Sequence, residues 1–172
     1  MPRQPAVVAL LAVLMAGCQA APATTPRITP GTSGLPREVN IIAKEWTFAP
    51  SVVDLVPGES VVLHLVNGGT EPHEWVIGNA RVQAAWEAAE AAVAGAPPGP
   101  TPVVSVAPDL AGLRITATSG ARVDVVWTVP GDGPAQAGFI VGCHIPGHFA
   151  NGMAVPVRWV GPDGVPLGTT GA

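Results

Sequence analysis

The stretch "CHIPGHFANGM", residues 143–153, places one cysteine, two histidines and one methionine within a single short segment. Four residues separate Cys143 from His148, and four more separate His148 from Met153. The internal Pro-Gly pair predicts a tight turn, so one loop can bring a thiolate, an imidazole and a thioether to one point. These soft-to-intermediate ligands suit copper, whereas zinc binds the thiolate and imidazole but has little use for a methionine.

A trigonal copper site needs a second imidazole, and the chain has four histidines in all. His73 follows an Asn-Gly-Gly loop between two predicted strands, where a rigid β-sandwich would present a remote ligand. His64 lies mid-strand in "VVLHLVN", which favours a hydrogen-bonded or surface histidine. Neighbouring side chains of an extended chain point to opposite faces, so if Cys143 faces the metal, His144 faces away. The sequence therefore favours His73.

The rest of the chain predicts an all-β domain over residues 38–161. Short, Val-rich segments alternate there with Gly, Pro, Asn and Asp, which is typical of an antiparallel sandwich or barrel of about seven or eight strands. One segment differs, because Asn79 is a good N-cap and the Ala-rich sequence after it ends at Gly-Ala-Pro-Pro.

This segment predicts a helix of about fourteen residues, inserted together with a Pro- and Gly-rich loop over residues 79–102. Helical periodicity gives the helix one apolar face, which we expect to pack on the sandwich through Trp86. The residues on that face are Val82, Ala85, Trp86, Ala89 and Val93. A role of the helix as a lid that docks a partner protein is an alternative.

The N-terminus has the organisation of a targeting signal. Arg3 precedes an apolar run from Ala6 to Ala16, which is too short to span a bilayer and has the size of a signal-peptide core. The ending "LMAGC" resembles a bacterial lipobox, in which the Cys becomes the lipid-modified first residue of the mature protein. We therefore predict a signal peptide at 1–17 and lipidation of Cys18, with export without a lipid as the alternative. The protein would then be a cell membrane lipoprotein that faces the periplasm or the extracellular side.

The segments that flank the predicted domain have little apolar pattern. Residues 18–37 are rich in Pro, Thr, Ala and Gly, which predicts a disordered tether, and residues 162–172 form a C-terminal tail. With Cys18 lipidated, Cys143 is the only thiol left in an exported protein. It has no partner for an intramolecular disulfide, so we expect it to be buried, reactive or bound to metal.

Composition and motif counts disfavour several classes of function. The formal net charge is −4 and no basic cluster exists, so nucleic-acid binding has no electrostatic basis. A Cys-His nucleophile pair is formally present, but nothing specifies the orienting group and oxyanion hole that hydrolases need. A multicopper oxidase or nitrite reductase needs more than four histidines, and a binuclear copper centre needs a second Cys where Gly147 stands. We expect a monomer that is not an enzyme.

The loop 143–153, together with the upstream "NGGTEPHEW" at 67–75, resembles the cupredoxins, the small blue-copper electron carriers. Its spacing is most similar to the rusticyanin, sulfocyanin and auracyanin branch. The resemblance covers roughly residues 38–160, with the predicted helix as an insertion. It implies a Greek-key β-sandwich that holds one copper ion through His73, Cys143 and His148, with Met153 as a weak axial ligand.

Two positions depart from the pattern of many relatives. Gly142 precedes the ligand Cys, where an aromatic residue is common, and Glu74 follows the first His, where Asn or Ser is common. The resemblance also implies that His148 is the ligand nearest the surface. An apolar rim around it would admit a redox partner by transient contact. The rim residues are Pro72, Ile145, Pro146 and Phe149.

These features together predict a membrane-tethered one-electron carrier between respiratory or photosynthetic partners, such as a cytochrome or a terminal oxidase. An exported carrier that delivers copper to a membrane oxidase is the alternative. Delivery sites tend to be exposed and rich in Met or His, to allow ligand exchange. Of the three methionines only Met153 lies in the predicted domain, which favours a fixed redox site.

Overall fold

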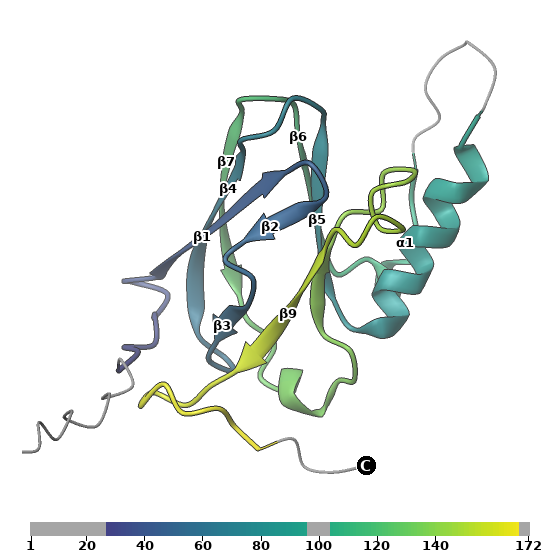
Figure 1. Cartoon of the computed structure of the whole chain (residues 1–172). Helices are drawn as coiled ribbons and strands as arrows, with labels where there is room; N and C mark the ends of the chain where they lie inside the picture. Colours follow the sequence, from purple (N-terminus) through teal and green to yellow (C-terminus); the bar gives the residue numbers. More distant parts are fainter. Residues whose placement is uncertain (1–26, 96–103, 169–172) are drawn as a thin grey trace, which may run out of the picture.

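The computed structural model of the chain describes residues 27–95 and 104–168. The predicted signal peptide and Cys18 lie outside the described residues. The described part consists of two β-sheets with the core between them and one long helix beside β5 (Figure 1). The elements in chain order are β1 (Arg37–Lys44), β2 (Thr47–Ala49), β3 (Val53–Leu55), β4 (Ser60–Asn67), β5 (His73–Gly78), α1 (Ala80–Val93), the 3₁₀ turn η1 (Pro108–Leu110), β6 (Leu113–Ala117), β7 (Arg122–Thr128), η2 (Gly133–Ala135), β8 (Ile140–Gly142) and β9 (Ala154–Trp159).

The sheets are mixed, whereas the sequence pattern predicts antiparallel ones. One sheet has the strand order β2-β1-β4-β7 and the other β3-β9-β8-β5-β6. β1 pairs with β4 in parallel, and β3 pairs with β9 in parallel, while the remaining neighbours are antiparallel. The cause is the path of the chain, which leaves β1, contributes β3 to the opposite sheet and then returns as β4, so that β4 runs in the direction of β1.

The described residues form nine strands, one or two more than expected, because the segment read as one strand near residues 38–50 is a hairpin. Lys44 lies opposite Thr47, so Glu45 and Trp46 alone make the turn between β1 and β2. Trp46 has a φ of 59°, in the left-handed region that a bulky side chain rarely adopts. No Gly, Pro or Asn marks this turn in the sequence.

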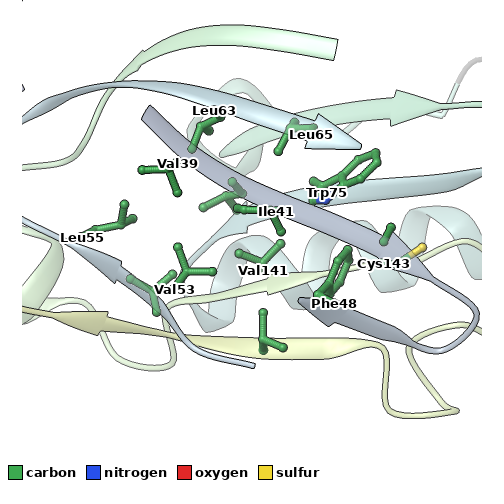
Figure 2. Packing of buried hydrophobic residues seen from close by; sticks show 14 of the residues in the cluster. Val39, Ile41, Phe48, Val53, Leu55, Leu63, Leu65, Trp75, Val141 and Cys143 are labelled. Carbon is green, nitrogen blue, oxygen red and sulfur yellow. The ribbon is translucent and has the colours of Figure 1, made fainter. Parts of the chain in front are cut away.

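The core lies between the two sheets and follows the two-residue period of the strands. Ile41 of β1 and Leu63 of β4 point inward from one sheet, and Trp75 of β5 and Val141 from the other (Figure 2). Cys143 belongs to the same cluster and is fully buried, near Phe48 at one end of it. The all-β sandwich predicted from the sequence is therefore confirmed, and its core reaches the loop that holds the predicted ligands.

Helix α1 begins where the sequence predicts. The side chain of Asn79 accepts hydrogen bonds from the backbone N–H groups of Arg81 and Val82, both at 3.1 Å. Two of the four unpaired N–H groups at the helix start are thereby satisfied. No helix in the part of the chain that the structure describes is long and apolar enough to cross a membrane.

The face that α1 buries is more polar than its periodicity predicts. Val82 and Trp86 pack with Val76 of β5 in a small second cluster, as expected. Gln83 and Glu90 are also buried, with exposed fractions of 5% and 7%. The remaining residues of the predicted apolar face are only half-buried, namely Ala85, Ala89 and Val93. Two polar side chains on the packed face of a helix require partners in the sheet.

The ordered domain begins before residue 38 and includes residues that the sequence assigns to the tether. The backbone N–H of Ile28 donates to the carbonyl of Pro162 at 3.1 Å, and that of Ser60 donates to the carbonyl of Gly31 at 3.0 Å. These bonds attach the end of the expected tether to β4 and to the segment after β9. Pro162, at the start of the predicted tail, is therefore part of the fold as well.

The core packing predicts a large difference between an inner and an outer aliphatic residue. Leu63 is fully buried, whereas Val126 on β7 is 69% exposed. We expect Leu63→Ala to lower the free energy of unfolding by about 2–5 kcal/mol, because a cavity remains where the side chain was. Val126→Ala should lower it by less than about 1 kcal/mol. Urea unfolding of the metal-free protein measures both, and equal losses would contradict the core assignment.

Candidate metal centre

Three of the predicted ligands converge on one point. The ligand atoms of His73, Cys143 and His148 all lie within 4.8 Å of one another. The two Nδ1 atoms of the histidines are 3.2 Å apart, and the Sγ atom of Cys143 is 3.3 Å from Nδ1 of His148. His73 and Cys143 are fully buried, and His148 is 4% exposed. Two imidazoles and one thiol thus share a site that excludes water.

Strand register explains why His73 and Cys143 meet. His73 is the first residue of β5, and Cys143 directly follows β8, the antiparallel neighbour in which Gly142 lies opposite Val76. Side chains alternate between the two faces of a sheet. His73 and Cys143 therefore face the interior with Trp75, while the intervening positions face α1.

The loop from Cys143 to Met153 closes on itself through the backbone. The N–H of Cys143 donates to the carbonyl of Met153, and the N–H of Met153 donates to the carbonyl of His148, both at 3.1 Å. Gly147 and Gly152 have φ values of 91° and 89°, which residues with a Cβ rarely adopt. The two glycines allow the chain to turn twice. Met153 is fully buried, and its backbone N–H is hydrogen-bonded to His148 of the cluster. Its role as axial ligand is a prediction.

Burial favours the uncharged forms of Cys143 and His73 when no cation is bound. Burial raises the pKa of the Cys143 thiol to about 11, and hydrogen bonds from the backbone N–H groups of Glu74 and Ile145 offset this only in part. Burial, together with the neighbouring His148, lowers the pKa of His73. At neutral pH the centre therefore holds a thiol and a neutral imidazole, and a metal that binds the thiolate must displace its proton.

The outer nitrogens of the two histidines each face a carboxylate. His73 Nε2 is buried without a hydrogen-bond partner, and the Oε1 atom of Glu45 lies 3.9 Å from it. His148 Nε2 lies 3.5 Å from the Oε2 atom of Glu71. Metal-bound histidines typically direct their second nitrogen toward such a group. The two histidine Nδ1 atoms and the Cys143 thiol face one another, and carboxylates lie beside the outer nitrogens. This set of groups fits a copper ion with three ligands in a trigonal arrangement.

The β1–β2 turn covers this site, which the sequence does not predict. The Trp46 ring meets the His148 ring edge to face, with ring centroids 4.7 Å apart, and Trp46 remains 41% exposed. The carboxylate of Glu45 accepts hydrogen bonds from the backbone N–H of Thr70, from its Oγ1 at 3.0 Å and from the N–H of Glu71 at 3.3 Å. The turn is thereby attached to the loop that precedes His73.

The two other histidines lie outside the cluster, as their strand positions predict. His64 on β4 contacts the carboxylate of Asp124 on β7, with Nδ1 2.8 Å from Oδ1. The His144 ring points away from Cys143, toward Gln83 and Glu87 of α1. These two contacts connect the ligand loop to the helix, a connection that no sequence motif indicates.

The four residues of the predicted apolar rim around His148 differ in their exposure. Pro72 and Pro146 are exposed, and Ile145 and Phe149 are half-buried. The Phe149 ring stacks on His144, with centroids 4.5 Å apart, and so lies against the helix side. The aromatic ring in contact with His148 is Trp46.

The attachment of Glu45 predicts a pH-dependent contribution to stability. Hydrogen bonds from the loop, above all from the Thr70 N–H, lower the pKa of Glu45 from 4.5 to about 2. A lowered pKa stabilises the fold fully above the unfolded value of 4.5, and this stabilisation is lost as pH falls through about 2. Relative to Glu45→Gln, the metal-free protein should be more stable at pH 7, and the difference should shrink in that window. A difference that stays constant down to pH 2 in urea unfolding would contradict this assignment.

Comparison with known proteins supports the fold. No family model and no curated protein matches the sequence. Auracyanin B, a solved structure, is 24% identical, with a TM-score of 0.53 over 81% of this chain and 100% of its own. Auracyanin A, a "blue" copper protein of the green thermophilic photosynthetic bacterium Chloroflexus aurantiacus, is 21% identical, with a TM-score of 0.51 over 72% of this chain and 99% of its own.

An azurin of the obligate methylotroph Methylomonas sp. strain J is 17% identical, with a TM-score of 0.51 over 73% of this chain and 98% of its own. These structures match nearly their whole length, so the likeness extends over complete domains. The sandwich is thus built like theirs. The chain has the cupredoxin fold that auracyanins and azurin share.

Proposed function

We propose that the protein is a type 1 copper protein that carries single electrons. One copper ion would bind to His73, Cys143 and His148, with Met153 as the axial ligand. The observation that carries this proposal is a buried cluster of two imidazoles and one thiol within a cupredoxin fold. When bound, copper supplies a one-electron couple between Cu(II) and Cu(I).

The protein's contribution is to hold these ligands still. Asn67 fixes the loop before His73, because its side chain donates to the carbonyls of Glu71 and Ala117 at 2.8 and 3.0 Å and accepts from the N–H of Gly69 at 3.0 Å. The loop with Cys143 is closed by its own backbone bonds. Ligands fixed in this way move little when the charge of the bound ion changes, which favours fast electron transfer.

Burial supports an electron carrier over the alternative of copper delivery. Transfer of copper to another protein requires that incoming ligands reach the ion. Here the two histidines and the cysteine are at most 4% exposed, and Trp46 covers His148. Ligand exchange would need this cover to open. Electron exchange requires only close approach.

We place the contact with redox partners at the end of the sandwich that carries Trp46. The Trp46 indole is the exposed group in contact with a proposed ligand, and the Glu71 side chain beside His148 is 54% exposed. Pro72 and Pro146 add apolar surface at the same end. A cytochrome or a terminal oxidase would approach here by transient contact. A lipid on Cys18 of the exported protein would hold the domain at the membrane.

The first test is the spectrum of the protein loaded with Cu(II), with Cys143→Ser as the control. We expect an intense thiolate-to-copper band in the red and a narrow copper hyperfine splitting in electron paramagnetic resonance. Both should be lost in Cys143→Ser, because the thiolate is their source. A pale, ordinary Cu(II) spectrum, or copper retained only as Cu(I), would exclude the electron carrier and favour copper delivery.

The acidic rim predicts which oxidants react fastest. Glu71 lies beside the proposed point of electron exit, so it should attract a cationic reagent such as tris(phenanthroline)cobalt(III). We expect Glu71→Gln to slow oxidation of the copper(I) protein by this reagent about twofold at low salt, with less effect at high salt. Glu38→Gln removes the same charge at the other end of β1 and should have no such effect. Equal rates in the two variants, by stopped flow, would place the exit elsewhere.

A further inference from the structure

The imidazole of His144, the neighbour of Cys143, is held on both sides by helix α1. Its Nδ1 lies 2.7 Å from the Oε2 atom of Glu87, and its Nε2 lies 2.6 Å from the Oε1 atom of Gln83. The ring is 1% exposed and stacks on Phe149. A side chain held by two hydrogen bonds and a stacked ring has a single orientation, and so does the peptide that carries it.

Gln83 is itself fixed by the strands beneath the helix. Its amide nitrogen donates to the carbonyls of Val76, Gly78 and Ile140, at 3.1, 3.2 and 3.2 Å. Because the nitrogen faces these three acceptors, the amide oxygen must face His144 and accept from its Nε2. One buried glutamine therefore connects α1, the ends of β5 and β8, and the residue next to the ligand cysteine.

A second connection reaches the backbone of the same residue. The N–H of His144 donates to Oε1 of Glu74 at 2.8 Å, and Oε2 of Glu74 accepts from Nε of Arg114 at 2.7 Å. Arg114 also donates to Oε1 of Glu90 at 2.7 Å, and its guanidinium lies 4.4 Å from the centre of the Trp86 ring. The buried Glu74 carboxylate is thus paired, and the pair is attached to α1.

We propose that α1 is a positioning element of the metal centre. Gln83 and Glu87 orient the His144 ring, while Glu90 and Arg114 hold Glu74 against the His144 N–H. Together they fix the peptide that follows Cys143 and hence the direction of its Sγ. This inference extends the proposed function. Only the measurements on the copper-loaded protein depend on that function. The alternative of a partner-docking lid leaves unexplained why Gln83 and Glu87 are both directed at His144 in the ligand loop.

The test uses Glu87, whose side chain is 48% exposed, so that its variants keep the fold. Glu87→Ala removes the acceptor of His144 Nδ1, while Glu87→Gln keeps an oxygen there. Hydrogen exchange of the His144 amide is measured by nuclear magnetic resonance in the metal-free protein. We expect Glu87→Ala to speed exchange about fivefold, the effect of one lost hydrogen bond, and Glu87→Gln to remain near the wild type. Arg81→Ala, on the exposed face of the same helix, is the control and should change nothing.

The copper-loaded variants give the second readout. Both Glu87 variants remove one negative charge and should raise the reduction potential by similar amounts. Only Glu87→Ala should also change the copper hyperfine splitting, because only it releases the ring. If the two variants agree in hyperfine splitting and in amide exchange, α1 does not position the loop. If the wild type lacks a type 1 spectrum, the proposed function fails, and amide exchange alone then decides the inference.

Discussion

The register between β5 and β8 is the constraint on which the metal centre depends. With Val76 opposite Gly142, His73 and Cys143 project from the same face at the same end of neighbouring strands. A slip by one residue would turn Cys143 toward the helix and His144 toward the core, because side chains alternate with a period of two. The apolar packing of Val141 enforces the register, since the same slip would turn this buried side chain of β8 from the core toward the helix. Core packing and ligand placement are therefore a single requirement.

The local parts of the site could be predicted from the sequence. Cys143, His148 and Met153 are close in the chain, and the Pro-Gly pair between them limits the shapes of the loop. The sequence indicates His73 less directly, through its place at a strand end. The cap at Asn79 was equally local, since an Asn before an Ala-rich segment satisfies N–H groups within its own turn. For the loop and for the cap, the partners that define the feature lie within a few residues, whereas His73 is distant in sequence from the other ligands.

The cover of the site could not be predicted in this way. Trp46 occupies a left-handed conformation that sequence rules assign to Gly or Asn, so the two-residue turn had no signature. The sequence does not indicate the polar contacts of α1, for a related reason. Helical periodicity assigns a face by its apolar residues, and Gln83 and Glu90 count against burial in such a pattern. Their partners in the sheet are distant in sequence, as Arg114 shows for Glu90.

The carboxylates around the centre bear on the state of an ion bound there. Glu45, Glu71 and Glu87 each have an oxygen within 4 Å of a histidine of this region. Negative charge favours the more positive oxidation state of a nearby ion, so these groups favour Cu(II) over Cu(I). Arg114 opposes this effect at Glu74, where the carboxylate is buried and screening by water is weakest. The net effect therefore depends on how each carboxylate is compensated. The buried charge of Glu74 is paired with Arg114, while Glu71 and Glu87, which reach solvent, are screened by water and salt.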